Sequence, residues 1–339
     1  MRTYSQHEAI AQMNAWGAAR TPFLFIVDYA QEAIVLVPLD QVEPATLRYD
    51  FRGKRNEPMP LERGASWAEA SGARPSLLWE VSAPSLPRYQ QAFDRVMQGL
   101  LRGDTFLCNL TARLPLRTNL SLEELFASSH APYRLWWKER FVCFSPEPFV
   151  RIDAEGLIST YPMKGTIDAS LPQAEGTLLN DAKEQAEHAT IVDLLRNDLS
   201  QVARRVEVRR YRYVERIATS QGAILQTSSE IVGQLPAVWP QQLGSLLMRL
   251  LPAGSITGAP KAMTQRIIAE AEGYERGYYT GVMGIYDGVS LDSAVMIRFV
   301  EQAQDGTLCF KAGGGITAQS TWEREYEEIL RKAHVAVTP

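Results

Sequence analysis

The sequence predicts an α+β protein, in which strands form antiparallel runs and helices occur between them at irregular intervals. Two observations support this fold class. Short apolar runs such as FLCNLTARLPL alternate with period two, and several follow one another across turn pairs such as Asp287-Gly288 and Asp305-Gly306. The segments with helical periodicity are unequally spaced, and the sequence contains no internal repeat. A doubly wound parallel sheet is therefore not expected.

The chain is best treated as one domain, because no long linker interrupts its 339 residues. Residues 1–85 are expected to form the N-terminal part of the fold, and residues 86–339 carry the functional motifs described below. The N-terminal part contains two strand-like runs, PFLFIVDY and AIVLVPL, followed by a polar stretch rich in Gly and Pro over residues 50–72.

The middle of the chain is predicted to contain helices separated by strands. Helical periodicity begins near Leu86 and ends near Gly103, a residue type that commonly follows the last helical turn. The strand-like runs FLCNLTARLPL, VCFSPEPFVRI and GLISTYPM come next, followed by a second helix over residues 172–203. A third helix should begin at Pro260, which suits a first helical position, and end at Gly273 or Gly277.

The C-terminal part is predicted to contain three strands and a helix. The strand-like runs are YTGVMGIY, DSAVMIRFVEQ and TLCFKAGGGIT. The last helix is expected to begin near Ser320, because Ser320 and Glu323 have the spacing of a capping box, and to run to about His334.

The composition argues against several classes of protein. The 35 Lys and Arg and 39 Asp and Glu give a net charge of −4, so nucleic acid is not an expected partner; five arginines between residues 204 and 212 are expected on solvated surface. No apolar run is long enough to span a membrane, and residues 1–4 lack a signal-peptide pattern, which predicts a cytoplasmic protein. Cys108, Cys143 and Cys309 each lie in an apolar run and are expected to be buried, reduced thiols.

Two pairs of glutamates share a spacing that places each pair on one face of a helix. Glu184 and Glu187 form the first pair, and Glu325 and Glu328 form the second. Like charges three residues apart repel each other, and a hard divalent cation such as Mg²⁺ would relieve this repulsion. Solvated helix faces explain the same spacing, so the pattern alone leaves both interpretations open.

Four further features could take part in chemistry, and each also has a plainer explanation. Lys164 could act as a nucleophile if its amine is desolvated, or lie in an ordinary ion pair. Glu147, between two prolines, could serve as a general acid or be a turn residue in water. The three glycines at 313–315 could offer amides to a carboxylate or form a tight turn. Arg298, within an apolar strand, requires an anionic partner, either in a substrate or inside the protein.

Taken together, the motifs resemble those of the chorismate-utilising enzymes, which include aminodeoxychorismate synthase component I, anthranilate synthase component I, isochorismate synthase and salicylate synthase. Nine segments occur in the order typical of that family: GDTFLCNLTAR, FSPEPF, YPMKGT, KEQAEHATIVDLLRNDL, PAGSITGAPK, ERGYYTGVMG, IRF, KAGGGIT and EREYEEILRKA. They cover about residues 86–335. The resemblance implies an anthranilate synthase component I-like fold with two packed, mainly antiparallel sheets flanked by helices.

The resemblance also implies a composition for the site. Glu187 and Glu328 would bind Mg²⁺ directly, while Glu184 and Glu325 would complete the metal site. Mg²⁺ would act there as a charge clamp and Lewis acid on a chorismate carboxylate. The remaining chorismate contacts would come from Ser255, Gln226, Tyr279, Arg298, Gly313, Gly314, Gly315 and Lys332.

The reaction type implied by the resemblance depends on Lys164, which lies in Pro162-Met163-Lys164-Gly165-Thr166. A lysine in this motif is typical of the branch that makes 4-amino-4-deoxychorismate, in which Lys164 adds to ring C2 and Glu147 protonates the departing C4 hydroxyl. No cysteine has the setting of an amidotransferase nucleophile, so ammonia is expected from a separate glutamine amidotransferase subunit. The product would pass to a separate aminodeoxychorismate lyase.

Two positions depart from the family pattern. Leu107 stands where the water-adding enzymes have a lysine, which disfavours water addition because leucine cannot accept a proton. Gln226 stands where the family often has a histidine, and glutamine can form hydrogen bonds but cannot change charge. Anthranilate synthase component I and a non-catalytic chorismate-binding relative are the alternative functions.

Overall fold

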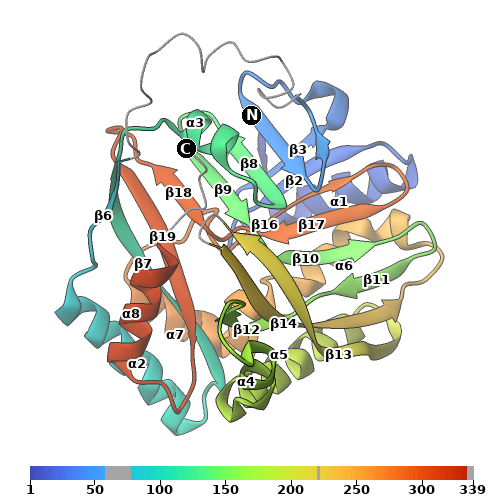
Figure 1. Ribbon diagram of the computed structural model, residues 1–339. Helices are drawn as coiled ribbons and strands as arrows, with labels where there is room; N and C mark the ends of the chain where they lie inside the picture. The colour runs from blue at the N-terminus through green and yellow to red at the C-terminus, as the bar shows by residue number, and fades with distance from the viewer. Residues whose placement is uncertain (58–77, 220–221, 334–339) are drawn as a thin grey trace. The chain divides into compact units, whose positions relative to one another are not determined.

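The computed structural model describes residues 1–57, 78–219 and 222–333. The chain divides into two compact units, each assembled from three stretches that alternate along the sequence. Unit 1 comprises Met1–Pro38, Glu147–Lys261 and Arg276–Val295; unit 2 comprises Leu39–Pro146, Ala262–Glu275 and Met296–Pro339. Each unit contains an antiparallel sheet and helices, which confirms the predicted α+β class with two antiparallel sheets (Figure 1). The expectations that the two sheets pack against each other and that the chain forms one domain stay predictions.

Unit 1 is built on a sheet with the strand order β1-β3-β2-β16-β17-β10-β11-β14-β12, in which β13 also pairs with β14. The strands are β1 (Thr3–Tyr4), β2 (Phe23–Val27), β3 (Ile34–Pro38), β10 (Pro148–Ile152), β11 (Leu157–Thr160), β12 (Met163–Asp168), β13 (Arg204–Thr219), β14 (Gly222–Gln234), β16 (Val282–Tyr286) and β17 (Leu291–Val295). The helices are α1 (Gln6–Ala18), α4 (Ala174–Asn180), α5 (Ala182–Ser200) and α6 (Leu243–Leu250). Helices α4 and α5 pack against β12 and β14, as Figure 1 shows.

Unit 2 contains a sheet with the order β7-β19-β18-β9-β8-β4-β5, and β6 pairs with β7. The strands are β4 (Leu47–Phe51), β5 (Lys54–Arg55), β6 (Trp79–Val81), β7 (Leu107–Thr118), β8 (Tyr133–Trp137), β9 (Phe141–Ser145), β18 (Phe299–Gln302) and β19 (Leu308–Ile316). The helices are α2 (Leu86–Arg102), α3 (Leu122–Ser128), α8 (Trp322–Lys332) and all but the first residue of α7 (Lys261–Glu272). Helix α8 packs on β19, and α2 packs on β7.

Two of the predicted helices have the expected ends. Helix α2 ends at Arg102, and Gly103 follows with φ +77°, a left-handed conformation that glycine adopts without a steric penalty. Helix α7 begins directly after Pro260 and ends before Gly273, which has φ +62°. Of the two predicted terminating glycines, Gly273 is therefore the one that ends the helix.

The helix predicted over residues 172–203 is instead two helices, α4 and α5. Asp181 separates them in an extended conformation, with φ −68° and ψ 111°. Its side chain accepts a hydrogen bond from the Glu184 N–H at 3.0 Å, so it caps the start of α5. The prediction of a single helix was wrong because the helical spacing of apolar residues continues through Asp181. Asp181 itself is both the residue that ends α4 and the N-cap of α5.

The predicted capping box of the last helix was also wrong. The N-cap of α8 is Thr321, which makes no side-chain capping hydrogen bond. The Ser320 hydroxyl instead donates to Glu325 Oε1 at 2.8 Å. The predicted end at His334 lies outside the described residues.

The predicted strand DSAVMIRFVEQ is divided between the two units, since β17 belongs to unit 1 and β18 to unit 2. Arg298 lies in the break with φ +54°, a left-handed conformation incompatible with a continuous strand. The prediction that Arg298 lies within a strand was therefore wrong.

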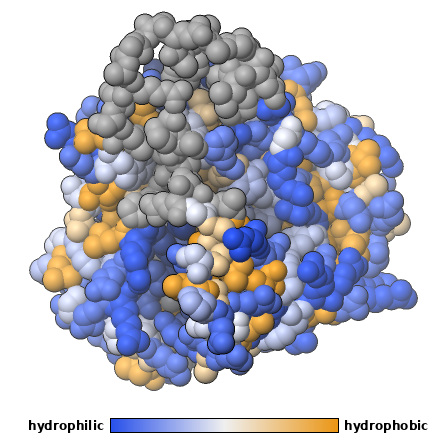
Figure 2. Space-filling model, in the orientation of Figure 1, coloured by the Kyte–Doolittle hydropathy of each residue, from blue (hydrophilic) through white to orange (hydrophobic). Residues whose placement is uncertain are grey.

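The surface of the described residues is of mixed polarity. Hydrophilic residues dominate the face shown in Figure 2, and apolar residues occur there in small scattered groups. None of the helices in the described ranges has the length and apolar character needed to cross a membrane.

Candidate functional site

Unit 1 brings Lys164 of β12 next to the first acidic pair, on α5. Lys164 Nζ lies 3.3 Å from Glu187 Oε2, and Lys183 Nζ lies 3.5 Å from Glu187 Oε1. Glu187 is thus paired with two lysine cations and is largely shielded, with 17% of its side chain exposed. The sequence did not predict this contact, because the residues are 23 positions apart.

Glu184 occupies a less favourable electrostatic position than Glu187. Burial raises the pKa of its carboxyl group, and the negative charge of Glu187 raises it further, while Lys164 opposes the shift. The ionised form of Glu184 is unfavourable because the group is buried and lies near the Glu187 carboxylate. A nearby cation would stabilise this ionised form. The pair therefore has the chemistry of a divalent cation ligand set.

Gly165 explains how α5 approaches β12 so closely. It has φ +76°, and a Cβ atom at this position would lie 3.1 Å from Glu184 Oε2 and 3.1 Å from Leu178 Cδ1. The pairing of β12 with β14 shifts register between Lys164 and Thr166, so Gly165 forms a bulge. Gln226 of β14 pairs with Thr166 on the far side of this bulge.

A buried histidine lies directly behind the acidic pair. His188 is fully buried, and its Nε2 lies 2.6 Å from the Ser229 hydroxyl, which also accepts a hydrogen bond from the Arg212 N–H at 2.9 Å. Burial, followed by the charges of Arg212 and Lys164, lowers the pKa of His188 to about 4, so the ring is neutral near pH 7. His188 was not among the predicted site residues, although it lies four residues after Glu184.

Arg212 differs from the other arginines of the 204–212 run. Its guanidinium donates to the carbonyl oxygens of Leu178 and Leu179 at 3.3 and 3.1 Å, and so stabilises the C-terminal end of α4. Solvated surface, which was predicted for the whole run, was therefore wrong for this part-buried residue.

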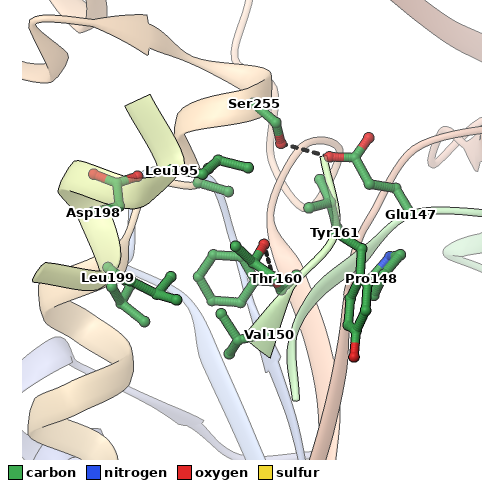
Figure 3. Close-up of a pocket in the computed structure, with 13 residues that line it drawn as sticks. Glu147, Pro148, Val150, Thr160, Tyr161, Leu195, Asp198, Leu199 and Ser255 are labelled. Atoms are coloured by element: carbon green, nitrogen blue, oxygen red, sulfur yellow. Dashed lines mark hydrogen bonds between the residues drawn. The ribbon is translucent and has the colours of Figure 1, made fainter. Parts of the chain in front are cut away.

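Glu147 and Ser255 form a second polar contact in unit 1. The Ser255 hydroxyl donates to Glu147 Oε1 at 2.6 Å, and both residues line a cavity with Asp198 and Thr160 (Figure 3). Ser255 lies in the 3-10 turn Gly254–Ile256, while Glu147 directly precedes β10. Asp198, which is 4% exposed, was not among the predicted site residues.

The wall of this cavity is mostly apolar, and Tyr279 is not part of it. The apolar lining consists of Pro148, Phe149, Val150, Leu195, Leu199, Leu250, Ala253 and Val295. Tyr279 lies elsewhere in unit 1, buried in a turn where its N–H donates to the Arg276 carbonyl at 3.2 Å.

Unit 2 contains the second acidic pair, on α8. Glu325 is 4% exposed and accepts the Ser320 hydrogen bond, whereas Glu328 Oε1 pairs with Lys332 Nζ at 2.5 Å. Burial raises the pKa of Tyr89, and the charges of Glu325 and Glu328 raise it further. The tyrosine therefore stays protonated beside these two carboxylates.

The glycine run of β19 packs against this acidic face. Lys332 Nζ donates to the Gly313 carbonyl at 3.1 Å. A Cβ atom on Gly314 would lie 3.4 Å from Glu325 Oε2 and 3.6 Å from Glu328 Oε1. Unit 2 thus gathers both glutamates, Lys332 and the glycines, while Arg298 lies before β18, where its carbonyl accepts from the Phe144 N–H at 3.1 Å.

The four predicted metal ligands are therefore described as one pair in each unit. Within the described ranges, no group of three His, Cys, Asp or Glu side chains is arranged to hold a metal ion. Each pair nevertheless supplies two carboxylates on one helix face, and one carboxylate of each pair already attracts a lysine cation. Oxygen donors of this kind suit Mg²⁺.

The cysteines offer no nucleophile. Cys108, Cys143 and Cys309 are buried, and none of them forms a disulfide. Burial raises the pKa of the Cys143 thiol, which keeps it protonated. The predicted buried, reduced state agrees with these positions.

The chain is similar to known proteins both in sequence and in fold. A family model described as chorismate binding enzyme matches residues 45–338. An uncharacterized PabA-like protein of Pasteurella multocida is 49% identical over 333 residues, covering 98% of this chain and 99% of that protein. An anthranilate synthase component 1 of Haloarcula marismortui is 33% identical, covering 88% of this chain and 63% of that protein. The menaquinone-specific isochorismate synthase of Escherichia coli has a similar fold, with a TM-score of 0.71 at 17% identity over 98% of this chain and 82% of that chain.

Proposed function

The chain belongs to the chorismate binding enzyme family, and we propose that within this family it is an aminodeoxychorismate synthase component I. Its substrates would be chorismate and ammonia, and its product 4-amino-4-deoxychorismate. The observation that carries the proposal is the position of Lys164, whose amine lies 3.3 Å from a carboxylate of the acidic pair on α5. A lysine at this point can form a covalent intermediate, which a small residue could not.

The first chemical step requires Lys164 to leave its ion pair with Glu187 and to pass a proton to water. The neutral amine then forms a bond to ring C2 as the C4–O bond breaks. Glu147 supplies the proton with which the C4 hydroxyl departs as water, in the role of general acid. Ammonia next forms the C4–N bond while the bond between C2 and Lys164 breaks, and the lysine leaves as an amine.

Mg²⁺, when bound, would neutralise substrate carboxylate charge and act as a Lewis acid. The proposed ligands are Glu187 and Glu328, with Glu184 and Glu325 completing the set. The proposed substrate contacts are Ser255, Gln226, Tyr279, Arg298, Gly313, Gly314, Gly315 and Lys332. Lys332 now pairs with Glu328, and Glu187 now pairs with Lys164. On ligand binding, Lys332 would pair with a substrate carboxylate and Glu187 with Mg²⁺.

Ammonia would come from a separate glutamine amidotransferase subunit, because the three cysteines are buried. The product would be consumed by a separate lyase that releases p-aminobenzoate for folate synthesis. We place the protein in the cytoplasm as part of this proposal. Neither nucleic acid nor membrane is a proposed partner.

Anthranilate synthase component I is the second candidate, favoured by the 33% identity to the Haloarcula marismortui protein. In that reaction ammonia attacks C2 directly and pyruvate is lost. Incubating the protein with chorismate, MgCl₂ and ammonium chloride separates the two activities. Aminodeoxychorismate detected by mass spectrometry, with p-aminobenzoate appearing only after lyase is added, supports the proposal; direct anthranilate fluorescence contradicts it. Binding of chorismate without any product would identify a non-catalytic relative.

Lys164→Ala tests the covalent step, and Lys183→Ala is its matched control. Both variants remove a lysine that pairs with Glu187. Loss of a nucleophile should lower kcat by at least about 10³-fold in Lys164→Ala. Lys183→Ala should stay within about threefold of the parent, because the Lys183 side chain is 46% exposed and its ion pair is screened by solvent. Equal activity of the two variants would disprove the role of Lys164.

A further inference from the structure

A buried ion pair in unit 1 has no role in the proposed reaction. Lys261 Nζ lies 2.9 Å from Asp198 Oδ1, with 6% of the Asp198 side chain and 19% of the Lys261 side chain exposed. Burial raises the pKa of the Asp198 carboxyl group, and Lys261 opposes this shift. Such a pair contributes little to stability compared with apolar residues of the same size, so a role beyond stability is a reasonable question.

The pair holds both ends of one loop. Asp198, near the end of α5, accepts a hydrogen bond from the Gly254 N–H, and Lys261 Nζ donates to the Leu250 carbonyl at 2.8 Å. A Cβ atom on Gly254 would lie only 2.8 Å from Asp198 Oδ2, so the backbone approaches this carboxylate more closely than a side chain would allow. The loop 250–261 is therefore fixed against α5.

The same loop carries Ser255, one residue after Gly254. The Ser255 hydroxyl donates to Glu147 Oε1 at 2.6 Å. Figure 3 shows this hydrogen bond on one side of the cavity and Asp198 on the other. A chain of direct contacts thus runs from Lys261 and Asp198 through the loop to Ser255 and Glu147.

We infer that Asp198 and Lys261 are positioning residues, which hold Ser255 where its hydroxyl orients the Glu147 carboxyl group. This inference rests on the proposed role of Glu147 as general acid. A hydroxyl that donates to a carboxylate favours its ionised form. The contact therefore fixes the direction of the carboxyl group and favours its ionised form.

The test compares Asp198→Asn, Ser255→Ala and the double variant. Asparagine retains the shape of Asp198 and removes its charge. Asp198→Asn should lower kcat by about 10-fold with KM changed by less than about twofold, because a positioned acid acts in the transition state. Ser255→Ala should lower kcat by a similar factor and also raise KM, because Ser255 is itself a proposed substrate contact. The double variant should be no slower than Ser255→Ala alone, since both changes remove the same contact. The alkaline limb of the pH–rate profile should move to higher pH in all three.

Two further variants separate positioning from stability. Lys261→Arg keeps the cation and should retain most of the activity. Asp50→Asn breaks a comparably buried pair in unit 2, where Asp50 Oδ2 lies 2.5 Å from Arg134 Nη2, and should lower the melting temperature without moving the pH profile. If Asp198→Asn does not fold, Lys261→Met provides the same comparison. Additive losses of Asp198→Asn and Ser255→Ala, or an unmoved alkaline limb, would overturn the inference.

A measurement without turnover keeps this inference separate from the proposed function. In protein labelled with ¹³C at the glutamate carboxyl carbons, the Glu147 signal is identified by its loss in Glu147→Gln. Its titration midpoint should rise to a similar extent in Ser255→Ala and Asp198→Asn. A parent that makes no aminodeoxychorismate but shows this shift would disprove the function and retain the positioning contact; a midpoint unchanged in Asp198→Asn would disprove the positioning.

Discussion

Replacing Gly165 by alanine should separate the conformational requirement of the β12 bulge from its contact with Glu184. Two effects are expected in Gly165→Ala. The residue has φ +76°, and a non-glycine residue in this region costs about 1–2 kcal/mol. The new Cβ atom would also lie 3.1 Å from Glu184 Oε2, so the carboxylate must move by a few tenths of an ångström.

Gly103 provides a matched control for the backbone effect. It has φ +77°, and a Cβ atom there would meet no atom within 4 Å. Gly103→Ala and Gly165→Ala should therefore lose similar stability, about 1–2 kcal/mol each, seen as a fall of a few °C in melting temperature. Only Gly165→Ala should displace Glu184.

The assay combines thermal unfolding with Mg²⁺ titration calorimetry and chorismate turnover with ammonium. Gly165→Ala should weaken Mg²⁺ binding and lower turnover by about 10-fold, because catalytic geometry tolerates small displacements poorly. Gly103→Ala should retain both properties within about twofold. If the two variants have the same Mg²⁺ affinity and turnover, the close approach of Gly165 to Glu184 has no functional consequence and the reasoning is refuted.

Two predictions concern buried titratable groups. Burial lowers the pKa of His188 to about 4 in the folded protein, whereas an unfolded chain has a histidine pKa of about 6.5. As the pH falls below about 6.5, the unfolded chain therefore binds a proton that the folded chain does not. The free energy of unfolding should decrease by about 2–3 kcal/mol between pH 6.5 and 4. His188→Gln should flatten the pH dependence of the melting temperature in this window, and His7→Gln, at an exposed position, serves as the control substitution. Lys311, 1% exposed and 2.9 Å from Glu301, has a pKa lowered by burial. Lys311→Met should therefore leave the melting temperature equal or higher. Glu301→Gln removes the carboxylate that pairs with this buried cation and should lower the melting temperature by several °C; the opposite order would contradict this account.

Local sequence patterns predicted the regular elements well. The start and end of α2, the end of α7 at one of two predicted glycines, and strands such as β7, β16 and β19 depend on periodicity and on glycine conformation, which are properties of neighbouring residues. The long strands β13 and β14 were not predicted. The predictions failed where the apolar periodicity continued through a residue at which the helix or strand ends in the structure. Asp181 divides one periodic segment into α4 and α5, and the left-handed conformation of Arg298 separates β17 from β18.

In the candidate site, too, contacts within one helix could be predicted from the sequence, and contacts between distant segments could not. Glu184 and Glu187, like Glu325 and Glu328, could be paired from the sequence because three residues of helix place two side chains on one face. The contact of Lys164 with Glu187, which the sequence did not predict, joins residues 23 positions apart, and that of Ser255 with Glu147 joins residues 108 positions apart.

The sequence by itself determined the order of the motifs, the membership of the family and the two acidic helix faces. Only the tertiary structure decided that Lys164 pairs with Glu187, that Gly165 must be small, and that Asp198 and Lys261 hold the Ser255 loop. The physical reason is that spacing along a helix or strand is fixed by local backbone geometry. Contacts between distant segments depend instead on strand register and on buried side chains, which no single segment specifies.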